Sequence, residues 1–313
     1  HIIYLINPKY ILGMMCLMNL LDIFRKDKKL KIELINVNNP LTDYIKKNIG
    51  KFQVICSPSR KFIWFKNAKV AGTSMYRGVM RPEVVDLISY KQNPSIFNEW
   101  WDNLTDRELE NYFKFTFVRN PFDRLVSAFS HIIVEGTIND YHKNIQLIEV
   151  GMSTDRIVNE TGHLEVTFDH VYLMFGLFIK RLIQHYDIND DSVHWMPQHI
   201  FTECDGTPIV DFIGKYENLD EDWRYVAEKI NVNTKLPFIS SSRTQKITNK
   251  TRYEMQKVHW KGYYFSNDII STVIHQYQKD FDLLGYRPIA LSLQQRIQIR
   301  KEMLNASGHD SIK

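Results

Sequence analysis

The stretch that decides the fold reads KFIWFKNAKVAGTSM and spans residues 61–75. Its first five residues form a short apolar run, which predicts a buried strand over 61–65. The run ends in a turn of small and basic residues, after which Thr73 and Ser74 open a helix. Free backbone N–H groups at a helix start, together with the positive end of the helix dipole, favour anion binding. The stretch therefore predicts an anion-binding turn between a strand and a helix, with a plain capped turn as the alternative.

A second stretch of the same kind reads KFTFVRNPFDRLVSAF, residues 114–129. It predicts a strand over 114–118 and, from an apolar stripe at helical spacing, a helix over 122–133. Arg119 lies at the carboxyl end of this strand, where open α/β sheets bind ligands. A guanidinium there and the Ser127 hydroxyl on the following helix together suit a phosphate. A structural salt bridge is the alternative role for Arg119.

A third apolar run predicts a strand over 209–213, and helical patterns cover 220–230 and 266–281. Strands that each lead through a turn into a helix indicate an α/β fold, with a central parallel sheet flanked by helices. The chain contains no repeat and no Pro/Gly-rich linker, which favours one domain with insertions. We expect an N-terminal extension over 1–60, a main domain over 61–290 and a helical C-terminal tail over 291–313.

The composition is that of an ordinary globular protein. The 313 residues are 44% hydrophobic and 24% charged, which excludes a disordered tail and a collagen-like chain. The net charge of +4 is too small for a nucleic-acid footprint, so no nucleic-acid partner is expected. The three cysteines, Cys16, Cys56 and Cys204, have no metal-ligand spacing, so we expect no metal site and favour a reducing compartment.

The N-terminal segment is apolar over 10–21 but is interrupted by Asn19 and followed by Asp22. The run is shorter than the roughly 20 residues that a membrane-spanning helix needs. It also lacks the small-residue cleavage site of a signal peptide. We expect a buried helix and no membrane contact, with a truncated membrane anchor or an interfacial segment as the alternative.

The two decisive stretches resemble the two cofactor signatures of the sulfotransferases that use 3′-phosphoadenylyl sulfate. They are most similar to the carbohydrate sulfotransferase group that includes the chondroitin 4-O- and HNK-1 enzymes. That group has P-K-V-A-C-T-N in the first loop, where residues 68–74 read AKVAGTS, and F-V-R-x-P-F-x-R-L-V-S-A in the second, which residues 117–128 match nearly throughout. Weaker similarities follow at His194–Trp195, in DFIGKYENL at 211–219, in SSRT at 241–244, and in KDF at 279–281.

The resemblance implies a P-loop-like three-layer fold and 3′-phosphoadenylyl sulfate as the donor. It implies that Arg119 and Ser127 hold the 3′-phosphate of the donor and that Arg243 closes over it. The residues that it implies for the 5′-phosphosulfate are Lys69, Val70, Ala71, Gly72, Thr73 and Ser74.

Three departures from the family pattern stand out. Ala68 replaces the proline of the first signature, and Gly72 replaces its cysteine. Cys204 keeps one half of a C-x-x-C pair, but Thr207 occupies the other half, so the disulfide that the resemblance implies cannot form. We therefore expect a cytoplasmic enzyme, with a Golgi-type membrane-anchored enzyme as the alternative if a longer N-terminus is missing.

The expected reaction is sulfuryl transfer to a hydroxyl or an amine of a carbohydrate or small metabolite. Lys69 is the candidate that stabilises the leaving phosphate, and an acceptor hydroxyl also needs a general base. No histidine lies between the two signatures, which leaves Glu99, His194 and His131 as candidates. The adjacent Trp100–Trp101 pair either holds a sugar face or packs in the core.

Two other functions stay open. A kinase-like transferase acting on a small molecule is one, although the Walker A order G-x-x-x-x-G-K-[ST] is not met because Lys69 precedes Gly72. A non-catalytic relative that only binds a nucleotide or a glycan is the other. The sequence leaves the acceptor and the oligomeric state undetermined.

Overall fold

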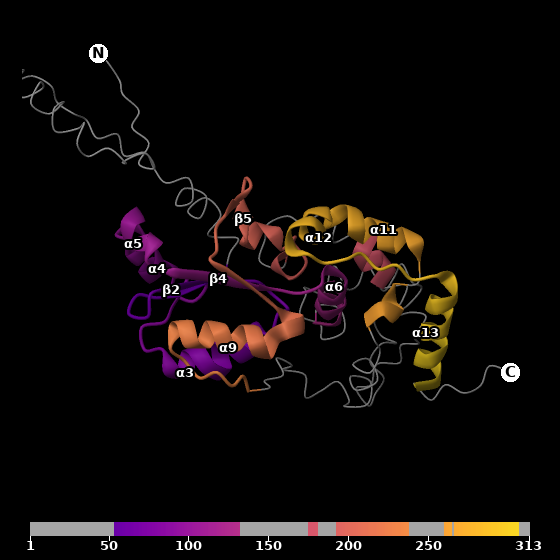
Figure 1. Ribbon diagram of the computed structural model, residues 1–313, viewed down its shortest axis with the longest axis horizontal. Helices are drawn as coiled ribbons and strands as arrows, with labels where there is room; N and C mark the ends of the chain where they lie inside the picture. The colour runs from indigo at the N-terminus through magenta and orange to yellow at the C-terminus, as the bar shows by residue number, and fades with distance from the viewer. Residues whose placement is uncertain (1–52, 132–174, 181–191, 238–259, 265, 307–313) are drawn as a thin grey trace, which may run out of the picture. The chain divides into compact units, whose positions relative to one another are not determined.

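The computed structural model describes residues 53–131, 175–180, 192–237, 260–264 and 266–306 (Figure 1). These residues all belong to one compact unit, Pro40–Lys313. The N-terminal apolar segment, Arg243 and the SSRT stretch lie outside the described residues. The expected domain boundaries at residues 60 and 290 stay predictions.

A five-stranded sheet forms the centre of the fold, with the strand order β3-β1-β2-β4-β7. The strands β2, β4 and β7 are parallel, whereas β1 is antiparallel to both β2 and β3. The sheet is therefore mixed and not purely parallel, because a hairpin through Pro58 and Ser59 joins β1 directly to β2. The strands are β1 (Gln53–Ser57), β2 (Phe62–Lys66), β3 (Ile88–Ser89), β4 (Phe113–Val118) and β7 (Phe212–Lys215).

Helices cover both faces of this sheet, as expected for three layers. Alternate side chains of β2 point to opposite faces, so that Phe62 and Trp64 pack with η2 and α9, and Ile63 and Phe65 pack with α4 and α5. Figure 1 shows α9 and α3 on the same side of the sheet. The helices named here are η2 (Ser74–Met80), α3 (Arg81–Glu83), α4 (Pro94–Asp102), α5 (Asp106–Glu110) and α9 (Leu219–Ile230).

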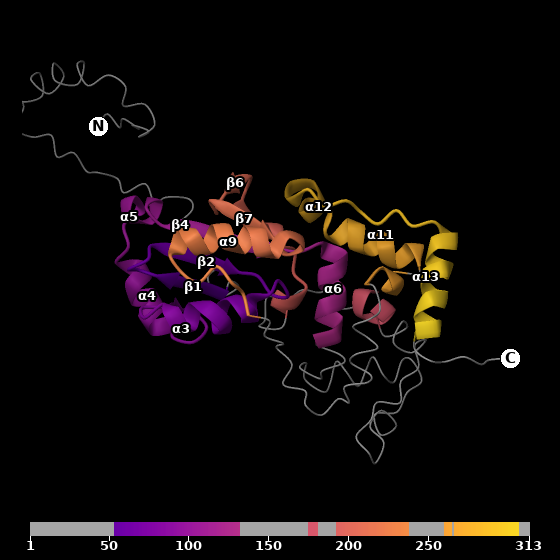
Figure 2. The same cartoon turned by 60° about the horizontal axis from the view of Figure 1, so that its bottom comes forward.

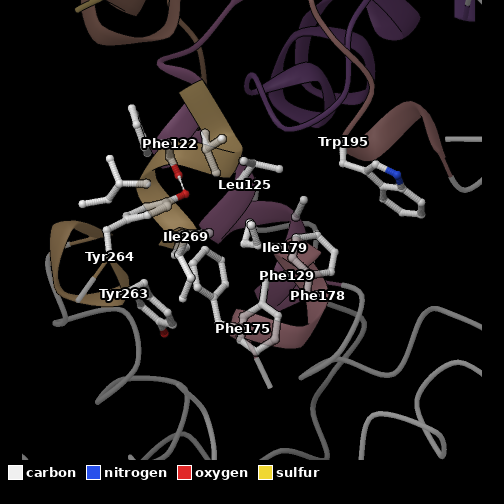
Figure 3. Close-up of a cluster of buried hydrophobic side chains, with 14 of the residues drawn as sticks. Phe122, Leu125, Phe129, Phe175, Phe178, Ile179, Trp195, Tyr263, Tyr264 and Ile269 are labelled. Atoms are coloured by element: carbon white, nitrogen blue, oxygen red, sulfur yellow. Dashed lines mark hydrogen bonds between the residues drawn. The ribbon is translucent and has the colours of Figure 1, made fainter. Parts of the chain in front are cut away.

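A separate aromatic cluster surrounds α6 beyond the end of β4 (Figures 2 and 3). The Phe122 ring packs edge-on against Tyr264, whose hydroxyl donates to the Phe122 carbonyl at 2.7 Å. This cluster anchors α6 at the carboxyl end of β4, where the second signature lies. The helices around it are α6 (Pro121–Phe129), η8 (Trp260–Tyr263), α11 (Asn267–Gln276), α12 (Gln278–Leu284) and α13 (Leu293–Ala306).

Short elements connect these layers. They are η5 (Ser192–His194), η6 (His199–Phe201), η7 (Tyr216–Asn218) and a hairpin of β5 (Glu203–Cys204) with β6 (Thr207–Pro208). In the part of the chain that the structure describes, no helix is long and apolar enough to cross a membrane.

Most of the expected elements are present, with two shifts. The third strand begins at Phe212 and not at Ile209, because Asp211 turns back to accept a hydrogen bond from the Lys114 backbone N–H at 2.7 Å. The helix expected over 266–281 is two helices that meet at Tyr277. The buried Tyr277 hydroxyl donates to the Trp195 carbonyl, which fixes this junction against the core.

Candidate functional site

The first loop has an unusual backbone. Lys69 and Ala71 have positive φ angles of 68° and 61°, in the left-handed region that few residues other than glycine adopt. Such conformations cost energy and cluster at functional sites. When left-handed and right-handed backbone conformations alternate, successive N–H groups point toward one position. Buried Val70 anchors the loop between them, and the helix begins as the Met75 N–H donates to the Ala71 carbonyl at 3.2 Å. This backbone is compatible with the anion-binding turn that the sequence predicts.

The side chain of Arg124 supports this loop through hydrogen bonds. Its guanidinium donates to the Ala68 carbonyl at 3.1 Å and to Asn67 Oδ1 at 2.9 Å. It also donates to the carbonyls of Val193 and Met196, at 2.9 and 2.8 Å. The side chain is 1% exposed, and this burial lowers the pKa of Arg124 to about 10, which keeps it charged at neutral pH. Arg124 therefore joins the first loop to the segment that carries His194.

Arg119 links the second signature to the first. Its Nε and Nη2 donate to the Asp123 carboxylate at 2.8 and 2.9 Å, and its Nη1 donates to the Lys69 carbonyl at 3.1 Å. Its guanidinium also lies over the Tyr216 ring, 4.0 Å from the ring centroid. The ion pair that was the alternative role is thus present. Described residues thus engage three of the five N–H groups of the guanidinium.

The side chain of Gln198 connects the two loops by hydrogen bonds. Its Oε1 accepts from Asn67 Nδ2 at 3.0 Å and from the Arg119 backbone N–H at 2.9 Å, and its Nε2 donates to the Arg119 carbonyl at 2.7 Å. The backbone N–H of Gln198 donates in turn to the buried carboxylate of Asp280. Asp280 also accepts from the His199 backbone N–H at 2.8 Å. A buried network in which every member is paired holds the loops rigidly.

The third similar stretch supports the second loop. Glu217 accepts from the backbone N–H of Asn120 at 2.7 Å and from the Tyr286 hydroxyl at 2.9 Å. Asn120 in turn caps α6, because its side chain accepts from the Phe122 N–H at 3.0 Å. Glu217 of the DFIGKYENL stretch, together with Tyr286, therefore positions the start of α6.

Ser127 lies on α6 two turns after Arg119 and is partly buried. No described residue forms a hydrogen bond with its hydroxyl. His131 follows one turn later, and its ring centroid lies 5.2 Å from that of His194.

His194 is the titratable group most affected by the site. Its pKa is lowered well below 6.5 by burial and by the positive charges of Lys69, His131, Arg124 and Lys66. Its Nδ1 is buried and has no hydrogen-bond partner among the described residues. Buried polar atoms normally have a hydrogen-bond partner, which a ligand can supply. The positive potential of the surrounding cations attracts an anion. The anion-binding turn stays a prediction, with a plain capped turn as its alternative.

Two of the sequence candidates, Glu99 and the tryptophan pair, lie on α4. Glu99 is exposed on α4, and no described hydrogen bond or ion pair joins it to either loop. Trp101 is 3% exposed and stacks on Phe97, and Trp100 packs edge-on against both rings. Trp101 therefore packs in the core, and the partly buried Trp100 packs against it.

Two of the three cysteines, Cys56 and Cys204, lie within the described residues. Cys204 and Thr207 are paired across the β5–β6 hairpin, whose turn residues Asp205 and Gly206 have positive φ angles of 48° and 80°. Both Cys204 and Cys56 are free thiols. Within the described ranges, no three His, Cys, Asp or Glu side chains come together as a metal site requires.

Sequence reasoning missed the residues that join the loops. Arg124 and Asp280 were inside quoted signatures but had no assigned role, since nothing local shows which backbone carbonyls a buried arginine will meet. Asn67 and Gln198 carried no signal, because they are 131 residues apart in the hydrogen bond that they form.

Comparison with known proteins agrees with this geometry. The chain matches the sulfotransferase family over residues 52–287, and it belongs to that family. No solved structure matches the chain.

Curated relatives are carbohydrate sulfotransferases. Carbohydrate sulfotransferase 11 of Mus musculus is 28% identical over 152 residues, which are 48% of this chain and 41% of the relative. Carbohydrate sulfotransferase 14 of Danio rerio is 28% identical over 184 residues, which are 57% of this chain and 45% of the relative. Carbohydrate sulfotransferase 10 of Gallus gallus is 25% identical over 201 residues, 59% of this chain and 50% of the relative. The chain thus spans half or less of the length of these relatives.

Proposed function

We propose that this chain transfers a sulfuryl group from 3′-phosphoadenylyl sulfate to a hydroxyl or an amine of a carbohydrate or a small metabolite. The observation that carries the proposal is the junction of the two loops, where Arg119 Nη1 donates to the Lys69 carbonyl at 3.1 Å. A nucleotide with phosphates at both ends of its ribose needs two anion-binding turns that adjoin in this way. The names of the relatives support the carbohydrate class of acceptor.

The residues fit such a ligand. The left-handed backbone at Lys69 and Ala71 suits the 5′-phosphosulfate, and the free donors of Arg119 with the Ser127 hydroxyl suit the 3′-phosphate. The cations that lower the pKa of His194 add the positive potential that a multiply charged anion needs. The remaining residues proposed to hold the nucleotide are Val70, Gly72, Thr73, Ser74 and Arg243.

The bound donor supplies the sulfuryl group, whose bond to the 5′-phosphate oxygen breaks as a bond from sulfur to the acceptor oxygen forms. Lys69 neutralises the charge that develops on the leaving phosphate. A base takes the acceptor proton, and we favour His194 over Glu99 because its Nδ1 is unpartnered and neighbours Lys69. His131, with its ring next to that of His194, is the second candidate. No metal ion enters the proposal, since a sulfuryl group carries less negative charge than a phosphoryl group.

The cytoplasmic location is also a proposal. Its support is that the described cysteines, Cys56 and Cys204, are free thiols and that Thr207 stands opposite Cys204. The Golgi-type location of a membrane-anchored enzyme is the alternative.

Binding of the spent nucleotide, adenosine 3′,5′-bisphosphate, tests the site directly. We expect Lys69→Ala and Arg119→Ala each to weaken its binding by about tenfold to a hundredfold, the loss expected for a hydrogen bond to a charged group. Arg107→Ala, an exposed arginine on α5, is the matched control and should bind as the wild type does. Equal affinity of all four proteins by calorimetry would show that the site is assigned wrongly.

Turnover tests the reaction. Incubation with labelled donor and a panel of glycans and small hydroxyl compounds should label an acceptor, and His194→Gln should lower kcat more than nucleotide affinity. Phosphoryl transfer from ATP that requires magnesium would instead favour the kinase-like alternative. Tight nucleotide binding without labelling of any acceptor would favour the non-catalytic alternative.

A further inference from the structure

Lys66 is a basic residue that the sequence signatures leave without a role, and the proposed function uses it only as one of the cations around His194. It is the last residue of β2, opposite Gln53 of β1, and it is partly buried. Its Nζ donates to Gln53 Oε1 at 2.8 Å, a neutral partner. Burial, followed by the charges of Lys91 and Arg77, lowers the pKa of Lys66 to about 8.

Gly72 makes room for this lysine. A Cβ atom built on Gly72 would stand 2.9 Å from Lys66 Cε, closer than real contacts allow. The lysine stem therefore lies against the backbone of the first loop, where the helix begins. The related signature has a cysteine at this position, and a side chain there would collide with Lys66 in the conformation seen here.

The groups that face Lys66 are all neutral or positive. Gln53 comes from β1, Arg77 from η2, Lys91 from the loop before α4, and His194 from η5. No described carboxylate forms an ion pair with Lys66 Nζ. A buried ammonium among cations is unfavourable unless an anion joins it.

We infer that Lys66 is a second cation of the first loop. Its ammonium group adds to that of Lys69 in strengthening the binding of the nucleotide's 5′ end. Gly72 is the positioning residue that admits the lysine stem. The inference rests on the proposed function, because it assumes that the nucleotide binds here.

The pH dependence of nucleotide binding tests this role. Affinity should be greatest while Lys66 is protonated and should fall as the pH rises through about 8, whereas the phosphates of the nucleotide complete their ionisation nearer pH 6. Calorimetry with adenosine 3′,5′-bisphosphate should show wild-type binding about tenfold weaker at pH 9.5 than at pH 7. Lys66→Met should bind about tenfold more weakly than wild type at pH 7 and show no such decline.

Two further variants separate charge from packing. Lys66→Arg keeps a charge at all these pH values, so it should retain affinity at pH 9.5. Lys235→Met, an exposed lysine after α9, should behave as the wild type at every pH. Gly72→Ala should weaken binding in the wild type and weaken it less in a Lys66→Ala background, because the colliding side chain is then absent.

The outcomes are distinct. If the wild type binds and Lys66→Met matches it in affinity and in pH profile, the role of Lys66 is overturned and the proposed function stands. If the wild type does not bind the nucleotide at any pH, both are overturned.

Discussion

At the scale of single residues, the site depends on a few buried polar side chains that contact backbone. Arg124 is the clearest, since four of its hydrogen bonds end on the first loop or on the segment 193–196. Each of these acceptors is far from Arg124 in sequence. Removing the guanidinium would leave buried carbonyls without donors, which costs more than a surface contact.

We expect Arg124→Gln to lower the free energy of unfolding by about 3 kcal/mol, the range for losing one partner of a buried charged network. Urea denaturation measures this loss. The exposed Arg107→Gln should change the free energy of unfolding by less than about 0.5 kcal/mol. Equal stability of the two variants would contradict the role of Arg124 as the support of the first loop.

The sequence identified the loops better than it identified their supports. A strand, a small-residue turn and a capped helix are local signals, so the positions of Lys69 and Arg119 at strand ends could be predicted. The Asp123 carboxylate that engages Arg119 sits four residues away and is visible at helical spacing only once the helix start is known. The contacts of Gln198 depend on the folded path of the chain and could not be predicted.

At the scale of elements, β4 and β7 lie close together at one glycine. Phe117 and Gly214 are paired in register, and a Cβ on Gly214 would stand 2.4 Å from the Phe117 ring. The glycine of the DFIGKYENL stretch is thus required by packing, not by an unusual backbone angle. The strand must stay in place for Tyr216 and Glu217 to reach the second loop.

We expect Gly214→Ala to lower the free energy of unfolding by about 1–3 kcal/mol, because the methyl group forces the ring or the strand to move. Gly176→Ala is the matched control in the helical segment 175–180. Its Cβ would meet only Ile269 Cδ1 at 3.4 Å, and alanine favours a helix, so stability should be unchanged or higher. Thermal unfolding followed by circular dichroism compares the two, and a harmless Gly214→Ala would refute the packing argument.

The expected parallel strands were found, but two antiparallel ones were not foreseen. β1 and β3 are short, and their residues do not form long alternating or apolar runs that would mark them in the sequence. Their pairing is set by the hairpin before β2 and by the return of the chain after α3. Element type was therefore predictable where the apolar run was strong, as in β2, β4 and β7, and not in β1 and β3.

At the scale of the whole molecule, the concentration of positive charge around His194 couples stability to pH. The unfolded chain takes up a proton on this histidine near pH 6.5, whereas burial and neighbouring cations delay its protonation in the folded state. The unfolded state then binds more protons, so stability falls as the pH drops below about 6.5.

We expect the wild type to lose stability between pH 6.5 and 5, by at most about 1.4 kcal/mol per pH unit from this residue. His194→Gln should lose less over the same interval, because glutamine does not titrate. The exposed His275→Gln on α11 should follow the wild type. Urea midpoints at pH 6.5, 5.8 and about 5 decide the matter, and parallel curves for wild type and His194→Gln would argue against the buried cationic environment.

The Gln198 amide that joins Asn67 to Arg119 also has a consequence for selectivity. These hydrogen bonds fix the distance between the two turns in the free protein. Under the proposed function, little conformational entropy of the chain is then lost when the nucleotide binds. A preset separation discriminates by ligand length. Under the proposed function, we expect a mononucleotide with a single phosphate to engage only one turn and therefore to bind more weakly than adenosine 3′,5′-bisphosphate.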